Sequence, residues 1–177
     1  SQGVKAQSLW SRGGYTPGFE LLKKFLRFIV GKKIIPVGRS KEKQKAMSNS
    51  FIRYVWLVIA MLDLIFLYAI IIRIKSFLGK VIICDRYLGD TYIDFSLNFP
   101  KSNFNKMWLW KLLTATLPKP DFCFLFTLSV ENSIYRSNLK NEPFPDSKEA
   151  LQQRLDMYKL SALFDAVDWV KINGDDT

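Results

Sequence analysis

The chain has 177 residues, of which 49% are hydrophobic and 24% are charged, so its composition excludes an intrinsically disordered protein. The formal net charge of +10 favours an anionic partner, which would be a nucleotide, a nucleic acid or an acidic membrane surface. The absence of histidine excludes imidazole acid–base catalysis and histidine-ligated metal. No strong DNA- or RNA-binding motif occurs, so we expect no nucleic-acid partner.

The two cysteines, Cys84 and Cys123, each lie inside an apolar, strand-like run. This placement predicts buried, reduced thiols rather than a disulfide framework or a metal site. No signal peptide is visible at the N-terminus, and we expect the chain to act in the cytoplasm. The first residue is Ser1 rather than Met, which is consistent with a fragment or a processed form.

The first third of the sequence predicts a strand, a loop and a helix. A weak strand pattern over residues 4–10 precedes Gly13 and Gly14, which mark either a loop where the backbone can approach a ligand or an ordinary surface turn. Residues 19–30 place apolar side chains at helical spacing. Residues 31–49 are polar and basic, and we expect a loop there.

Residues 51–78 predict a long helix whose surroundings the sequence leaves open. Residues 54–72 contain one charged residue, Asp63. On an insertion scale each Leu, Ile, Phe or Val contributes about −0.3 to −0.6 kcal/mol, and a central Asp costs about 2.5–3.5 kcal/mol, so a membrane-spanning helix is permitted. However, an acid at mid-span usually needs a polar partner, and Gly79 predicts a helix C-cap. A buried core helix or a dimer interface is the alternative.

The predicted fold is organised around residues 81–87, Val-Ile-Ile-Cys-Asp-Arg-Tyr. The apolar run predicts a strand buried on both faces, as in a parallel sheet. Ligands of open α/β sheets bind at the carboxyl ends of the strands, where Asp85 and Arg86 would lie. A carboxylate there can hold Mg²⁺, and a guanidinium can bind phosphate oxygens in a bidentate way. A strand end with a surface ion pair is the alternative.

The remainder alternates helices and strands. Residues 88–97 predict a helix that carries Asp90 and Asp94 on one side, either towards the ligand end of the sheet or towards solvent. Further helices are predicted over residues 103–116, 131–139 and 148–164, and further strands over residues 122–128 and 169–172. This alternation predicts an α/β fold with a parallel sheet.

These features, taken in order, resemble the thymidylate kinases and their thymidylate kinase-like relatives, within the P-loop nucleoside monophosphate kinases. The residues that carry the resemblance are Arg12-Gly13-Gly14, Asp85-Arg86-Tyr87, Lys119-Pro120-Asp121, Val130-Glu131 with Arg136, and Arg154 with Tyr158. The resemblance covers most of the chain. It implies one domain over residues 1–177, truncated at both termini, with a three-layer parallel sheet flanked by helices and a lid-like segment over residues 131–147.

The resemblance implies transfer of a phosphoryl group from ATP, with Mg²⁺, to a (deoxy)nucleoside monophosphate such as dTMP, in a homodimer. Such transfer depends on positioning and charge stabilisation, so histidine is unnecessary. The implied substrate site consists of Arg12, Gly13, Gly14, Arg86, Asp90 and Asp94. By resemblance, Asp85 would position the metal or the acceptor, and Arg136 and Lys140 would close over the transferring group, with Arg136 also contacting ATP.

The chain departs from the family pattern in its phosphate-binding loop. No Gly-x-x-x-x-Gly-Lys-Ser/Thr occurs in the 177 residues, whereas the family carries this loop before the position of Ser1. We therefore expect an N-terminally truncated sequence, with a degenerate paralogue as the alternative, and no ATP-dependent catalysis from the chain as written. A non-catalytic nucleotide-binding homologue and a protein anchored in a membrane by residues 54–72 are the other hypotheses.

The acceptor also differs from the thymidylate kinase pattern. The family commonly has an arginine after the aspartate of the long helix, and here Asp63 precedes Leu64. Asp90, Ile93 and Asp94 stand where thymidylate kinases usually have Ser, Tyr and Gln. A relative with a different acceptor nucleotide is therefore an alternative.

Overall fold

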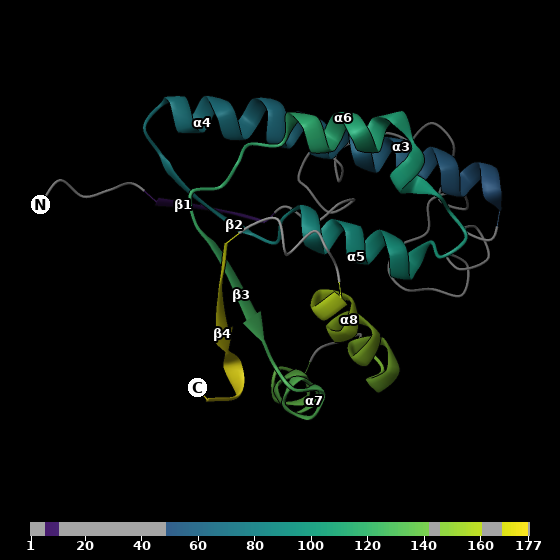
Figure 1. Ribbon diagram of the computed structural model, residues 1–177, viewed down its shortest axis with the longest axis vertical. Coiled ribbons are helices and arrows are strands. Elements are labelled where there is room, and N and C mark those ends of the chain that lie inside the picture. Colours follow the sequence, from purple (N-terminus) through teal and green to yellow (C-terminus); the bar gives the residue numbers. More distant parts are fainter. Residues whose placement is uncertain (1–5, 11–48, 142–145, 161–167, 177) are drawn as a thin grey trace, which may run out of the picture. The chain divides into compact units, whose positions relative to one another are not determined.

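The computed structural model describes residues 6–10, 49–141, 146–160 and 168–176, as a mixed α/β structure with two small parallel sheets (Figure 1). The chain divides into two compact units, Ser1–Pro118 and Lys119–Thr177. The predicted helix over residues 19–30 and the predicted loop up to residue 48 lie outside the described residues.

The sheet of the first unit pairs β1 (Ala6–Trp10) with β2 (Val81–Asp85) in parallel, and both predicted strands are confirmed. Burial alternates along β2, because Ile82 packs against the hydrophobic core whereas Ile83 is 57% exposed. The prediction that this strand is buried on both faces is therefore wrong for the described residues. A run of apolar residues cannot show how many layers cover a strand, and here the core of the unit meets one face of β2.

One long helical stretch, seen as α3 and α4 in Figure 1, runs through the first unit. It supplies most of the buried residues of the core of that unit. Its consecutive parts are α3 (Ser50–Phe66), the π-helical segment η1 (Leu67–Ile72) and α4 (Arg73–Phe77). Oδ1 of Asn49 accepts hydrogen bonds from the N–H groups of Phe51 at 2.9 Å and Ile52 at 3.4 Å, and so caps the first turn. The helix predicted over residues 51–78 is confirmed, and the π-helical turns within it were not predicted.

Gly79 closes the C-terminus of this helix. Its φ of 72° lies in the left-handed region that glycine adopts without steric cost. The N–H of Gly79 donates to the carbonyl of Ser76 at 2.9 Å, and the N–H of Lys80 donates to the carbonyl of Lys75 at 3.1 Å. These two bonds form a Schellman motif, which confirms the predicted glycine C-cap and leads the chain directly into β2.

The core of the first unit lies where one face of the long helix meets α5 (Leu88–Asn98), the short turn η2 (Phe104–Lys106) and α6 (Trp108–Thr116). Rings from α5, η2 and α6 pack edge to face, and the centroid of Phe104 lies 5.5 Å from that of Phe95 and 5.1 Å from that of Trp110. The single helix predicted over residues 103–116 is wrong, because Met107 is extended and separates η2 from α6.

The second unit contains the other parallel pair. Its elements are β3 (Cys123–Thr127), α7 (Val130–Leu139), α8 (Lys148–Leu160), β4 (Trp169–Asn173) and the short turn η3 (Gly174–Asp176). β3 pairs with β4 in parallel, and α7 packs against α8. The predicted strands and the helix over residues 131–139 are confirmed, whereas residues 161–164 of the last predicted helix lie outside the described residues. The single three-layer sheet of a P-loop protein stays a prediction.

Both cysteines are free thiols, as predicted. Cys123 is buried and Cys84 is half-buried, and burial raises the pKa of each thiol. The reactive thiolate form is therefore disfavoured in both, which fits a packing role for the two side chains.

Two leucines of α3 test the packing of the long helix. Leu64 is 0% exposed and Leu62 is 49% exposed. Leu64→Ala should lower the free energy of unfolding by about 2–5 kcal/mol, because it removes apolar contacts and leaves a cavity. Leu62→Ala, the matched control, should cost at most about 1 kcal/mol. Urea denaturation of both variants provides the comparison, and equal losses would show that the assigned core face is wrong.

Candidate functional site

The candidate site of the first unit lies where β2 ends and α5 begins. Asp85 is the last residue of β2 and is exposed, and Arg86 follows it with a φ of 72°. A left-handed conformation costs a residue other than glycine about 1–2 kcal/mol. Such conformations cluster at binding and catalytic sites, where the surrounding structure enforces them.

Asp90 holds this turn together. Its Oδ2 accepts a hydrogen bond from the N–H of Tyr87 at 3.1 Å, and its Oδ1 lies 3.7 Å from Nη1 of Arg86. A carboxylate in the first turn of a helix also interacts favourably with the helix dipole. Asp90 thus caps α5 and pairs with the guanidinium beside it, a role that the sequence analysis did not predict.

Tyr87 anchors the same turn to the long helix. Its hydroxyl donates to the carbonyl of Pro118 at 2.6 Å, and its ring meets that of Tyr68 edge to face with centroids 4.9 Å apart. Tyr68 lies in η1 and is fully buried. Sequence reasoning missed Tyr68, since apolar periodicity does not reveal which aromatic side chain of a long helix will contact a distant turn.

Asp94 lies one turn beyond Asp90 on α5 and is only 5% exposed. Thr91 is 1% exposed, and its Oγ1 has no hydrogen-bond partner among the described residues. The prediction that Asp90 and Asp94 lie on one side of a helix is consistent with α5. Their surroundings differ, however, because Asp90 is at the helix terminus and Asp94 is in the interior.

Arg136 and Lys140 belong to the second unit. They lie one turn apart, at the end of α7 and at its C-cap. Both line a hollow of about 290 Å³ beside α7 and α8, to which Ser133, Ser137 and Asp146 also contribute. Nη2 of Arg136 donates to the carbonyl of Gly174 at 2.8 Å. The structure therefore brings together the two cations that the sequence assigned to the lid.

Asp175 joins η3 to the N-terminus of α7. Its carboxylate accepts hydrogen bonds from Nδ2 of Asn132 at 2.7 Å and from the N–H and Oγ of Ser129, each at 3.0 Å. Hydrogen bonds from Asn132 and from the N–H of Ser129 are the main reasons that its pKa lies below the ordinary value, and the charge of Arg136 adds to them. The sequence predicted no role for Asp175.

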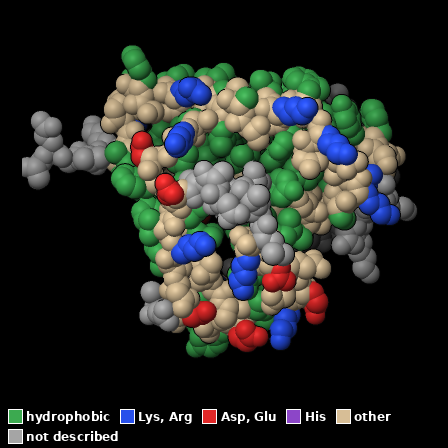
Figure 2. All heavy atoms as spheres, viewed as in Figure 1, with side chains coloured by type: hydrophobic (Ala, Val, Ile, Leu, Met, Phe, Trp, Pro, Cys, Tyr) green, Lys and Arg blue, Asp and Glu red, His purple; other side chains and the backbone are tan. Residues whose placement is uncertain are grey.

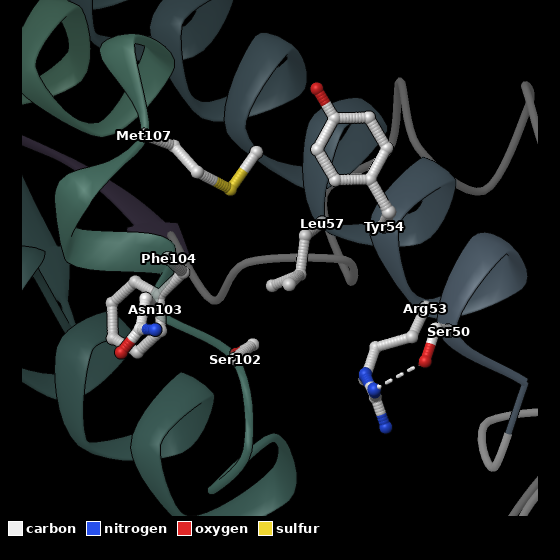
Figure 3. Close-up of a pocket in the computed structure, with 8 residues that line it drawn as sticks. All are labelled: Ser50, Arg53, Tyr54, Leu57, Ser102, Asn103, Phe104 and Met107. Atoms are coloured by element: carbon white, nitrogen blue, oxygen red, sulfur yellow. Dashed lines mark hydrogen bonds between the residues drawn. The ribbon is translucent and has the colours of Figure 1, made fainter.

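A second hollow, of about 210 Å³, lies in the first unit near the start of α3 (Figure 3). Figure 3 shows Tyr54, Leu57 and Met107 around it, with Arg53 donating from Nη2 to Oγ of Ser50 at 3.0 Å. None of the residues assigned to substrate or cofactor from the sequence lines this hollow.

The donors for a metal ion are few. No group of three or more Asp, Glu, Cys or His side chains that could hold a metal occurs among the described residues. Mg²⁺ is commonly bound by one or two carboxylates together with water and substrate phosphates. Asp85 therefore fits Mg²⁺ as one ligand of a metal that is held mainly by a nucleotide.

Of the predicted substrate residues, Arg86, Asp90 and Asp94 lie in the turn after β2 or on α5, next to the predicted metal ligand Asp85, whereas Arg12, Gly13 and Gly14 lie outside the described residues. Comparisons of the chain with protein-family models, with curated proteins and with solved structures find no match. The resemblance to thymidylate kinases accordingly stays a prediction, and function has to be inferred from the geometry and chemistry of these residues.

Asp175→Asn tests the junction between η3 and α7. A carboxylate whose pKa is lowered in the folded state stabilises the fold above its ordinary pKa of about 3.8, and this contribution disappears as the pH falls through the lowered value. The parent chain should therefore lose stability more steeply below pH 4 than the variant does.

Urea midpoints measured between about pH 2 and pH 5 provide the test, over the range in which Asp side chains protonate. Asp168→Asn, which removes one exposed negative charge from the same unit, is the matched control for net charge. Parallel pH profiles for the parent and Asp175→Asn would contradict a stabilising role for these hydrogen bonds.

Proposed function

We propose that the chain is a nucleoside monophosphate kinase-like protein, and that the carboxyl end of β2 binds the phosphate of the acceptor nucleotide. The observation that supports this most is the left-handed backbone of Arg86, at the junction between a parallel strand and the N-terminus of α5. This is where open α/β sheets bind their ligands, and a helix N-terminus favours anions.

The alternative, a structural ion pair, is weaker on energetic grounds. Nη1 of Arg86 and Oδ1 of Asp90 are 3.7 Å apart, and both side chains are partly exposed, at 33% and 23%. Partly exposed pairs contribute about 0–1 kcal/mol, whereas the left-handed conformation costs about 1–2 kcal/mol. The ion pair alone does not offset that cost. The contacts that Tyr87 makes with Asp90, Tyr68 and Pro118 help to offset it, and a phosphate bound by Arg86 would add to them.

The proposed chemistry needs groups that orient and neutralise phosphates rather than acid–base catalysts. Arg86 would bind acceptor oxygens in a bidentate way, with Asp90 orienting its guanidinium. Asp85 would contribute one ligand to Mg²⁺. The hollow that contains Arg136 and Lys140 would bind phosphates of ATP, and the glycine-rich loop that cradles these phosphates in the resembling family does not occur within residues 1–177.

Arg86→Ala tests the acceptor site directly. Losing hydrogen bonds from a charged donor costs about 1.5–3 kcal/mol, so the affinity for a nucleoside monophosphate should fall by about tenfold to a hundredfold. Lys80→Ala is the matched control, because Lys80 is an exposed cation that precedes β2 at its opposite end. Isothermal titration of the parent and both variants with dTMP, UMP, CMP, AMP and GMP provides the measurement.

Binding of at least one monophosphate that weakens in Arg86→Ala and not in Lys80→Ala supports the proposal. Equal weakening in both variants would indicate non-specific attraction to a basic protein, and no saturable binding in the parent would remove the acceptor site. A protein that binds the acceptor and, when joined to a P-loop segment, transfers no phosphoryl group from Mg²⁺-ATP would instead be a non-catalytic homologue.

A further inference from the structure

The long helix has an exposed apolar face in addition to the face that it buries. Its exposed members follow one another in steps of three, four or seven residues. They are Phe51, Val55, Leu62, Phe66, Ile70, Ile74 and Phe77, and their exposed fractions lie between 37% and 92%. We call these seven residues the exposed stripe. Val58, which lies between Val55 and Leu62 at the same helical spacing, is half-buried and is not counted in the stripe.

The π-helical segment keeps the stripe on one side. In an α-helix each step of four residues drifts by about 40° around the axis, so Phe66, Ile70 and Ile74 would spread apart along an unbroken α-helix. The wider turn of η1 absorbs this drift, because hydrogen bonds from residue i to i+5 put more residues into each turn. An apolar stripe that is maintained through a change of helix type is consistent with one extended binding surface.

The buried face of the helix argues against a membrane-spanning orientation. The helix Ser50–Phe77 is long and apolar enough to cross a bilayer, yet 39% of its most apolar window is buried inside the protein. Met61, Leu64 and Tyr68 on that face are completely buried in the core. A spanning orientation would have to remove this face from its core, whereas a helix lying along a surface can use both faces at once.

The net charge of the elements that carry exposed apolar residues favours an anionic surface over a second copy of the chain. Residues 49–118 contain eight Lys and Arg side chains, four Asp and no Glu. On the long helix and on η2 and α6, the charged residues are Arg53, Asp63, Arg73, Lys75, Lys106 and Lys111. Pairing two identical copies through this region would bring two surfaces of net positive charge together, whereas anionic lipid head groups attract Lys and Arg at about 1 kcal/mol per residue.

α6 carries further exposed apolar side chains. It packs beside α3, and Nη2 of Arg73 donates to the carbonyl of Thr116 at the end of α6, at 3.1 Å. Trp108 and Leu112, one turn apart on α6, are 66% and 40% exposed. Figure 2 shows hydrophobic side chains and Lys or Arg side chains together along the edge over α3, α4 and α6. Exposed tryptophan among apolar and basic side chains is typical of surfaces that lie at a membrane interface.

We propose that the exposed stripe, together with α6, binds the surface of an anionic lipid membrane, with the long helix parallel to the bilayer plane. The apolar side chains enter the boundary between head groups and acyl chains, and the flanking cations contact lipid phosphates and carboxylates. This interaction is separate from the acceptor site, since none of the seven stripe residues belongs to the turn between β2 and α5.

The test is sedimentation of the 177-residue chain with vesicles of phosphatidylcholine alone and of phosphatidylcholine with phosphatidylserine. The parent should bind the phosphatidylserine vesicles, release from them at high salt and bind neutral vesicles at least tenfold more weakly. Leu62→Gln with Phe66→Gln should reduce the apparent affinity by at least about tenfold, because both side chains lose their apolar burial in lipid. Lys111→Glu should reduce it by at least about fivefold on anionic vesicles only.

Tyr135→Gln with Leu139→Gln is the matched control, because these residues are also four apart on a helix and are 62% and 64% exposed. This pair should bind as the parent does, and circular dichroism should show native helix content in every variant.

Equal binding to neutral and anionic vesicles, no binding to either, or equal loss in both double variants would overturn the proposal. Retention after alkaline carbonate would indicate a spanning helix. A dimer that only Leu62→Gln/Phe66→Gln dissociates, without vesicle binding, would make the stripe an interface between copies.

Discussion

The first unit depends on the contact between one face of the long helix and the turn that follows β2. Tyr68, fully buried in η1, packs edge to face with Tyr87, whose hydroxyl is bonded to the carbonyl of Pro118. Tyr87, the residue that follows Arg86, is therefore fixed against the long helix. This anchoring allows Arg86 to keep a left-handed conformation that it would not adopt in isolation.

Asp85, Asp90 and Asp94 are three carboxylates at or near one strand end, and they have three different surroundings. Asp85 is exposed, Asp90 caps a helix and pairs with Arg86, and Asp94 is buried. A carboxylate that is already hydrogen-bonded within the protein is less available to a ligand, so Asp85 is the carboxylate of the three that would bind the proposed Mg²⁺.

In the second unit, a hydrogen-bonded carboxylate again organises the local structure. Asp175 is bonded to Ser129 and Asn132 at the start of α7, and Arg136 is bonded to the neighbouring Gly174. The end of β4 and the start of α7 are thus held together. Arg136 serves this junction and also lines the hollow with Lys140, so a phosphate that binds there would compete with, or add to, an existing contact.

The amino-acid sequence by itself determined the four strands β1 to β4 and the long helix with its glycine C-cap. It also determined the order of α5, α7 and α8. These features depend on local periodicity, on capping residues and on glycine conformation, which neighbouring residues decide. Only the tertiary structure decided that Ile82 of β2 packs on the core while Ile83 is exposed among the described residues, that Met107 is extended between η2 and α6, that Tyr68 supports Tyr87, and that Asp175 binds the start of α7. The contacts of Tyr68 with Tyr87 and of Asp175 with Ser129 and Asn132 join residues distant in the sequence, and no local pattern records which of them will meet.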